Sequence, residues 1–391
     1  MVEKWKKSLD KTGKCGALLT DLSKAFDCLI HDLLIAKLHA YGFDYLSLKL
    51  IRSYLTGRLQ RVRVNASFSS WREILTGVPQ GSVLGPEFYN INSNDLFLFL
   101  VLDIANYADD NSPFAVAPTI PSVISQLEQE SVTLLNWIRN NGLKANPDKF
   151  HLILSDPSDE FSIKIENVDV KNSICQKLLG VKIDSKLTFN DHVASLCTKA
   201  SQKLHALSRI SNYMTLMQRK IIMKTFIISQ FCYCPLAWMF HSRKLNGRIN
   251  RLHERALRLV YRDDSSTFDE LLIKDESYTV HERNIQTLAI ELYKVAYKLC
   301  PKIMNLVLPL NTEATYAGEN TFRTFNVKSV YWGTETLAHL GPKVWSLIPE
   351  DMKKFSLSKF TQKIRKWRPK KCPCRICKTY IKGLGFVTIS T

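Results

Sequence analysis

The chain has 391 residues, of which 45% are apolar and 10% aromatic, a composition that excludes a disordered protein and allows two or three domains. It contains no run of about 18 uncharged apolar residues and no apolar N-terminal signal core, so neither a membrane span nor secretion is expected. Ten scattered cysteines predict reduced thiols in an intracellular protein, in the cytoplasm or nucleus, and the net charge of +18 predicts a polyanionic partner.

The pattern of apolar residues predicts alternating strands and helices up to about residue 190. A short apolar run over 16–22 predicts a buried strand that ends in Asp21, and apolar residues at helical spacing follow over 23–43. An antiparallel sheet with helices on one face accounts for the order of the elements, so the expected fold class is α+β. The remaining elements expected are a helix over 44–58, a hairpin over 59–78, a helix after Pro86, strands on both sides of 109–110, a helix over 119–142, and strands over 149–155, 161–170 and 177–184.

From about residue 190 the pattern becomes helical and strongly basic. Between residues 199 and 262 the chain carries 13 Lys and Arg residues and one acidic residue, Glu254. A solvated helix surface normally intersperses acids among its bases, so this region favours nucleic-acid phosphates as the partner. The expected division is an N-terminal remnant (1–13), a mixed unit of strands and helices (14–190), a basic helical unit (191–310) and a C-terminal region (311–391).

Two adjacent carboxylates, Asp109 and Asp110, lie at the expected tip of a hairpin, between the stretches "FLFLVLDIA" and "FAVA". A plain surface turn accounts for them, because Asp favours turns. A Mg²⁺ site is the alternative, because two close carboxylates repel each other unless a cation relieves them. In an antiparallel sheet the strand ending in Asp21 can lie beside this tip, so that three carboxylates converge. Such a set is typical of a two-Mg²⁺ site for phosphoryl transfer.

Three motifs in a fixed order resemble the palm of reverse transcriptases of the non-LTR (LINE-type, jockey-like) retrotransposons. They are "LLTDLSKAFD" (18–27), "GVPQGSVLGP" (77–86) and "NYADD" (106–110). The stretches 142–154, 177–193 and 229–261 are similar to the segments that follow in that family, which are the next motif, the primer-grip hairpin with the start of the thumb, and the region beyond it. The resemblance implies an RNA-directed DNA polymerase, with a palm over 14–190 and a helical thumb over 191–310.

The resemblance also implies a role for individual side chains. Asp21, Asp109 and Asp110 would hold two Mg²⁺ ions, or Mn²⁺ in their place. Phe26 would be the steric gate against a ribose 2′-hydroxyl, Gln80 and Gly81 would contact template and nucleotide, and Lys149 would protonate the departing pyrophosphate. Without the resemblance, Phe26 would be interpreted as a core aromatic and Lys149 as a solvated lysine. Gln80 and Gly81 would be interpreted as part of a simple turn. The implied partners are an RNA template, a DNA primer and deoxynucleoside triphosphates, and within the basic helices the residues expected to bind the duplex are Arg248, Arg251, Arg255 and Arg258.

Two features depart from the family. Only 20 residues precede Asp21, where the family has fingers that clamp the triphosphate, so we expect the chain to be the carboxyl portion of a longer polyprotein. Glu87, Asn90 and Asn92 occupy a helix that is mostly apolar in the family. Both features predict impaired catalysis. The alternative function is that of a catalytically inactive, nucleic-acid-binding relic or a domesticated fragment.

The tail carries a basic run with three cysteines, "KIRKWRPKKCPCRICK" over 363–378. The basic residues are typical of a nuclear signal or a nucleic-acid patch. Cys372, Cys374 and Cys377 provide three thiolates, whereas a structural zinc site needs four ligands, and no His or Cys follows. The pattern therefore favours free thiols over zinc, for which His339 would be a distant fourth ligand.

Overall fold

The computed structural model describes residues 1–158, 160–311, 321–329, 331–369, 372–374, 376–381 and 385–388. The chain forms two compact units. Residues 13–176, with Met1, make the first unit, and residues 2–12 together with 177–391 make the second. The division thus falls at 176 and not at the expected residue 190. The first residues are not a separate remnant, because they form helix α1 (Val2–Asp10), whose buried Lys6 donates from Nζ to the carbonyl of Glu335 at 2.7 Å.

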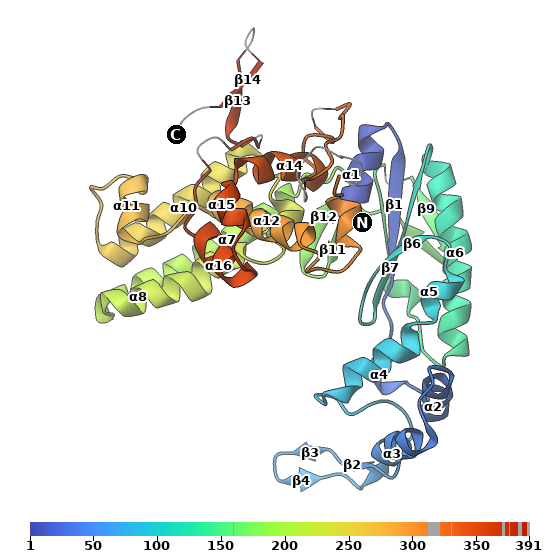
Figure 1. The fold of residues 1–391 in the computed structure, drawn as a ribbon. Coiled ribbons are helices and arrows are strands. Elements are labelled where there is room, and N and C mark those ends of the chain that lie inside the picture. Colours follow the sequence, from blue (N-terminus) through green and yellow to red (C-terminus); the bar gives the residue numbers. More distant parts are fainter. Residues whose placement is uncertain are drawn as a thin grey trace. The chain divides into compact units, whose positions relative to one another are not determined.

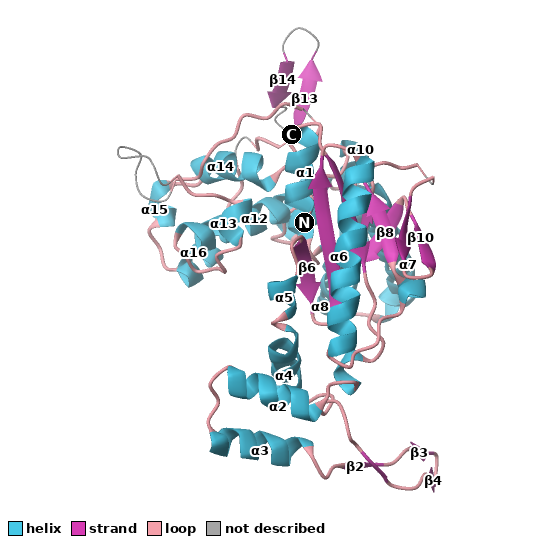
Figure 2. Cartoon of the chain, turned by 90° about the vertical axis from the view of Figure 1, so that its right-hand side faces the viewer, coloured by secondary structure: helices cyan, strands magenta, loops and turns pink. Residues whose placement is uncertain are grey.

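A four-stranded antiparallel sheet with the order β6-β7-β1-β8 organises the first unit (Figure 1). Its strands are β1 (Lys14–Leu19), β6 (Asp103–Tyr107), β7 (Asp110–Ala117) and β8 (His151–Leu154). Figure 2 shows helix α6 (Ile120–Asn140) running along one face of this sheet. The helix packs against β1 and β7. Leu127, Leu134 and Ile138 recur on one face of α6 and are fully buried, which is why this segment forms an amphipathic helix on the sheet. The predicted α+β class is confirmed.

The other elements of the first unit are shorter. The hairpin predicted over 59–78 is present as two pairs of two-residue strands, and β9 pairs with β10. The bounds are α2 (His31–Ala40), α3 (Tyr45–Leu55), β2 (Leu59–Gln60), β3 (Arg63–Val64), β4 (Ser67–Phe68), β5 (Arg72–Glu73), α4 (Leu84–Ser93), α5 (Leu96–Phe99), β9 (Ser162–Ile165) and β10 (Val168–Lys171).

The helix predicted over 23–43 begins only at His31. Residues 20–30 are held by other segments instead, since Leu22 pairs with Ala145, and the amides of Gly77 and Val78 donate to the carbonyls of Leu29 and Phe26. A single turn of 3₁₀ helix over Ala25–Asp27 is all that forms there. Tertiary hydrogen bonds therefore override the local helical pattern in the segment that follows Asp21.

The second unit is mainly helical, as predicted for the chain after residue 190. Its core surrounds α12, whose Ile285, Leu288 and Leu292 are fully buried. No helix in the described part of the chain is long and apolar enough to cross a membrane. Besides α1 the elements are β11 (Cys175–Leu178), which reaches across the division, β12 (Val181–Asp184), α7 (Asn190–Ile210), α8 (Leu216–Ile222), α9 (Pro235–Trp238), α10 (Arg243–Tyr261), α11 (Phe268–Lys274), α12 (Val280–Ala296), α13 (Met304–Val307), α14 (Leu337–Leu347), α15 (Glu350–Lys353), α16 (Leu357–Ile364), β13 (Lys378–Ile381) and β14 (Gly385–Thr388).

Some of the cations of 199–262 serve the fold of this unit. Arg219 is only 6% exposed, and its guanidinium donates to the carbonyls of Val260 at 2.9 Å and Met214 at 2.7 Å. Lys220 and Lys224 both pair with Asp275, whose carboxylate is fully buried. The cationic surface open to a partner is therefore smaller than the count of basic residues suggests.

Replacing Arg219 by Met should lower the free energy of unfolding by about 3 kcal/mol, because the carbonyl groups of Val260, Met214 and Ser211 lose their donor. Chemical denaturation followed by circular dichroism measures this change. The control is Arg209→Met at the exposed end of α7, which should stay within about 0.5 kcal/mol of the wild type. Equal stability of the two variants would contradict the structural role of Arg219.

Candidate active site

The tip of the β6–β7 hairpin carries the adjacent carboxylates. Tyr107 pairs with Asp110, so Ala108 and Asp109 form a two-residue turn, and Ala108 has the left-handed conformation that such turns need, with φ of 53°. The side-chain amide of Asn106 donates to the side-chain oxygen of Asn111 at 2.7 Å across the hairpin. The two aspartates are thus presented by a turn that is fixed on both sides.

Asp21 lies next to this tip. Thr20 forms a β-bridge with Asn111, and its amide donates to the Asn111 carbonyl at 3.0 Å. The residue that follows Thr20 is therefore brought beside the residue that precedes Asn111. Burial, followed by the charges of Asp109 and Asp21, raises the pKa of the Asp110 carboxyl. The structure therefore brings the three predicted carboxylates to one end of the sheet, close enough for the charges of Asp109 and Asp21 to act on Asp110.

Lys149 reaches the same cluster from a turn of 3₁₀ helix (Pro147–Lys149) before β8. The Asn146 amide donates to the Asp21 carbonyl at 3.2 Å and the Ser23 amide to the Lys144 carbonyl at 2.8 Å, so the loop before this turn runs alongside the Asp21 segment. The Lys149 Nζ atom lies 3.5 Å from Oδ2 of Asp21. The fourth predicted residue of the site is thus paired with one of the three acids.

Phe26 is half-buried and stacks on Tyr89 of helix α4, with ring centroids 4.5 Å apart. Burial, with a further contribution from the charge of Asp109, raises the pKa of the Tyr89 hydroxyl. Tyr89 therefore connects Phe26 with the carboxylate cluster. Sequence reasoning missed Tyr89, although its place in the helix that follows the "GVPQGSVLGP" motif was a usable signal.

Gln80 and Gly81 lie in the loop that approaches Phe26. The Gln80 amide donates to the Asp27 carboxylate at 2.9 Å, and Gly81 has a positive φ of 78°. Position 77 requires glycine more strictly than position 81 does. Its φ is 85°, and a Cβ atom there would lie 2.7 Å from the backbone of Asp27. A glycine at 77 allows the two motif loops to touch.

A pocket of about 580 Å³ opens beside Gln80. Its lining includes two cations, Lys24 and Arg58, as well as the acids Asp27 and Glu73. Sequence reasoning missed Lys24 and Arg58. Lys24 was hidden inside a predicted helix, whereas it has a left-handed conformation with φ of 52° that turns the chain there.

The polar residues predicted to disturb helix α4 differ in their surroundings. Glu87 and Asn90 are exposed, so their polar side chains reduce the stability of the fold little. Asn92 is 1% exposed, and its side-chain amide has no hydrogen-bond partner among the described residues. An unpaired buried amide is costly, so the expected conflict remains at this one position.

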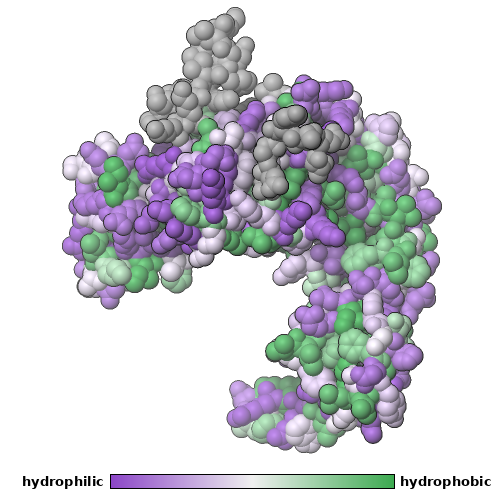
Figure 3. Space-filling view, in the orientation of Figure 1, coloured by the Kyte–Doolittle hydropathy of each residue, from purple (hydrophilic) through white to green (hydrophobic). Residues whose placement is uncertain are grey.

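The second unit carries a basic stripe along α10. Lys244, Arg248, Arg251 and Arg255 are all exposed, and their spacing of four, three and four residues places them on one face of the helix. Arg258 is different, because its guanidinium pairs with Glu254 at 2.7 Å. Hydrophilic side chains cover most of the face of this unit that Figure 3 presents. Three of the four predicted phosphate-binding arginines thus form an accessible cationic surface.

Comparison with known proteins identifies the family of the first part of the chain. Residues 2–183 match the model of the family "Reverse transcriptase (RNA-dependent DNA polymerase)". This part of the chain is a reverse transcriptase domain of the LINE type. The probable RNA-directed DNA polymerase from transposon BS of Drosophila melanogaster is 30% identical over 65% of the chain, and the RNA-directed DNA polymerase from mobile element jockey of the same organism is 28% identical over 46%.

The chain spans less than a third of the length of these relatives, 30% of the first and 21% of the second. Among solved structures, apo telomerase from Candida tropicalis aligns over 78% of the chain and 55% of its own length, with a TM-score of 0.39 and 11% identity. This likeness is too low to carry an argument about function.

Proposed function

We propose that the reverse transcriptase domain catalyses two-metal nucleotidyl transfer to a primer 3′-hydroxyl, copying an RNA template into DNA. The convergence of Asp21, Asp109 and Asp110 carries this proposal. Relatives named as RNA-directed DNA polymerases support the reaction type. The basic stripe on α10 supports a nucleic-acid partner held by its phosphates.

The donor set fits divalent metal ions. Burial, followed by the charges of Asp109 and Asp21, raises the pKa of the Asp110 carboxyl, and a cation of charge two would relieve the repulsion between the carboxylates. Oxygen ligands of this kind suit Mg²⁺, with Mn²⁺ as a substitute. When bound, two Mg²⁺ ions would activate the primer hydroxyl and neutralise the charge of the departing pyrophosphate.

We assign the remaining roles to residues around this cluster. Lys149, whose Nζ atom lies 3.5 Å from Oδ2 of Asp21, would donate a proton to the departing pyrophosphate. Phe26, held by its stack on Tyr89, would restrict the sugar to a deoxyribose. Gln80 and Gly81 would contact the template and the incoming nucleotide.

The deciding experiment is primer extension by the purified chain on an RNA template. We expect slow incorporation of deoxynucleotides, in line with the impaired catalysis predicted from the sequence, that requires Mg²⁺ or Mn²⁺ and stops when EDTA is added. Binding of the primer–template without incorporation under either metal would contradict the proposal and favour the alternative of a nucleic-acid-binding relic.

Lys24 and Arg58 should contribute to binding of the nucleotide triphosphate, since they are the cations that line the pocket beside Gln80. Replacing either by Ala should raise KM for deoxynucleotides roughly tenfold, about 1.4 kcal/mol, with a smaller change in kcat, because a charge-assisted contact is lost. Steady-state extension at varied nucleotide concentration measures this. Lys49→Ala on the exposed face of α3 is the control and should leave KM unchanged. An unchanged KM in both pocket variants would show that this pocket is not part of the nucleotide site.

A further inference from the structure

Four metal-binding side chains that are far apart in the sequence meet in the second unit. Cys372, Cys374 and Cys377 come from the tail, and His281 comes from the first turn of α12. The Nε2 atom of His281 lies 3.5 Å from Sγ of Cys372 and 3.3 Å from Sγ of both Cys374 and Cys377. His339, the distant ligand considered from the sequence, is not part of this group.

The distances match a tetrahedral site. All four ligand atoms lie within 4.8 Å of one another. With Zn–S bonds of about 2.3 Å and Zn–N bonds of about 2.0 Å, the edges of a tetrahedron measure about 3.5 to 3.8 Å. The three S···N distances of the group are close to this range, so a single ion can reach every ligand with small movements of the side chains.

Hydrogen bonding alone does not account for the cluster. Nε2 of a neutral imidazole accepts one hydrogen bond, whereas three thiols approach it, and a thiol is a weak donor and acceptor. Cys372, Cys374 and His281 are each about 7% exposed, so water cannot satisfy them freely. Polar groups that converge in a buried place need a partner, and a metal ion bonds all four at once.

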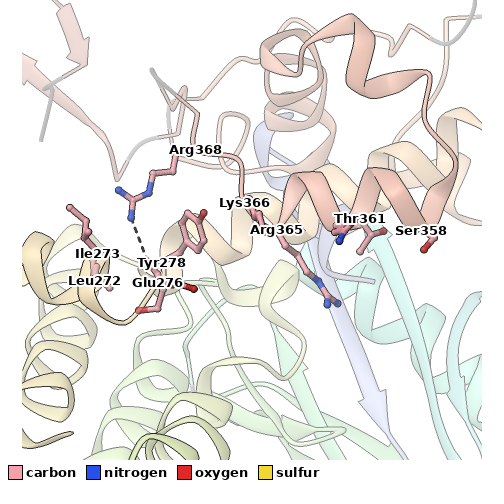
Figure 4. A pocket seen from close by; sticks show the side chains of 11 residues that line it. Leu272, Ile273, Glu276, Tyr278, Ser358, Thr361, Arg365, Lys366 and Arg368 are labelled. Carbon is pink, nitrogen blue, oxygen red and sulfur yellow. Dashed lines mark hydrogen bonds between the residues drawn. The ribbon is translucent and has the colours of Figure 1, made fainter. Parts of the chain in front are cut away.

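The chain brings the two halves of the cluster together by contacts that do not depend on a metal. Arg368, four residues before Cys372, donates to the carbonyl of Ser277 and lies over the ring of Tyr278, just before His281 (Figure 4). The Gln286 amide, five residues beyond His281 on the same helix, donates to the carbonyl of Trp367 at 2.9 Å. The tail is thus laid along the start of α12 with its cysteines facing the imidazole.

We propose that His281, Cys372, Cys374 and Cys377 form a structural zinc site that fastens the tail to the N-terminal end of α12. Three thiolates and one imidazole leave no open position for a substrate, as in structural and not catalytic zinc sites. Thiolate ligands also favour zinc over Mg²⁺, which binds oxygen. The site lies within the second unit and is chemically distinct from the carboxylate cluster.

The test is metal analysis of the full chain purified without a polyhistidine tag. We expect one zinc per chain, and we expect Co²⁺ exchanged into the protein to give the intense visible absorption of a tetrahedral thiolate site. Both measurements use the wild-type protein, so they do not depend on whether a variant folds. A wild-type chain that holds no zinc and takes up no Co²⁺ would overturn the proposal.

Two pairs of variants identify the ligands. Cys377→Ser should abolish zinc binding, whereas Cys300→Ser, another half-buried cysteine of the same unit, should retain it. His281→Ala should release zinc to a competing chelator at a concentration at least roughly tenfold lower than the wild type requires, because losing even an outer partner of a ligand weakens metal binding by about that much. His339→Ala should behave like the wild type, and equal loss of zinc in both His variants would exclude His281 as the fourth ligand.

Removing the metal should also loosen the tail. Treatment with a chelator is expected to speed tryptic cleavage after Arg365 and Lys366, because metal binding and local folding are coupled. A cleavage rate that is unchanged by the chelator would argue against a role in fastening the tail.

Discussion

Asp109→Asn should reduce Mg²⁺-dependent primer extension by about 10³-fold or more, equivalent to about 4 kcal/mol in the barrier. Asp109 lies in the two-residue turn of the β6–β7 hairpin, next to Asp110 and to the segment that carries Asp21. An amide keeps the size of the side chain but removes its charge, so the variant should fold while the cluster loses affinity for divalent ions. Single-nucleotide incorporation measured under excess enzyme gives the rate.

The matched control is Asp103→Asn, an exposed aspartate on strand β6 of the same hairpin. This variant should extend primers at the wild-type rate. Primer–template binding, measured by fluorescence anisotropy, should be retained in both variants, because the phosphate contacts proposed for α10 lie on another unit. Wild-type extension by Asp109→Asn would show that the cluster is not the catalytic centre.

The arrangement of the carboxylates follows from patterns that a sequence contains. An apolar run before Asp21 and two apolar runs around Asp109 and Asp110 predict three strands of one antiparallel sheet, and the structure pairs β1 with β7 and β7 with β6. The periodicity of α6 likewise predicts its buried face. These features depend on neighbours in the sequence or on one sheet, so local patterns are sufficient to find them.

Other features depend on contacts between distant residues, which no local pattern records. The segment 23–30 has a helical pattern, yet backbone hydrogen bonds to Gly77 and Val78 hold it in another conformation. His281 is 91 residues from Cys372 and lies in a predicted helix without any metal-binding spacing. Arg219 appears in the sequence as one more surface cation, although it is buried against backbone carbonyls. In each case the tertiary partner, and not the residue type, decides the role.

Neutralising the basic stripe should weaken duplex binding and reduce its dependence on salt. The triple variant Arg248→Gln, Arg251→Gln, Arg255→Gln removes three exposed charges from one face of α10. Each phosphate contact contributes about 0.9 to the slope of log K against log salt, so the slope should fall by about 2 to 3. Titrations of an RNA–DNA duplex between low and moderate salt measure it, and duplexes of different sequence should give similar values because phosphate contacts carry no sequence information.

The control must change the net charge equally, so that local contacts are separated from the field of the whole chain. Lys298, Lys302 and Lys354 are exposed in the same unit and lie outside α10, and their replacement by Gln should leave the slope nearly unchanged. Arg258→Gln should also have a small effect, since its charge already pairs with Glu254 at 2.7 Å. Equal slopes for the two triple variants would mean that α10 has no special contact with the duplex, because net charge alone would then explain the binding.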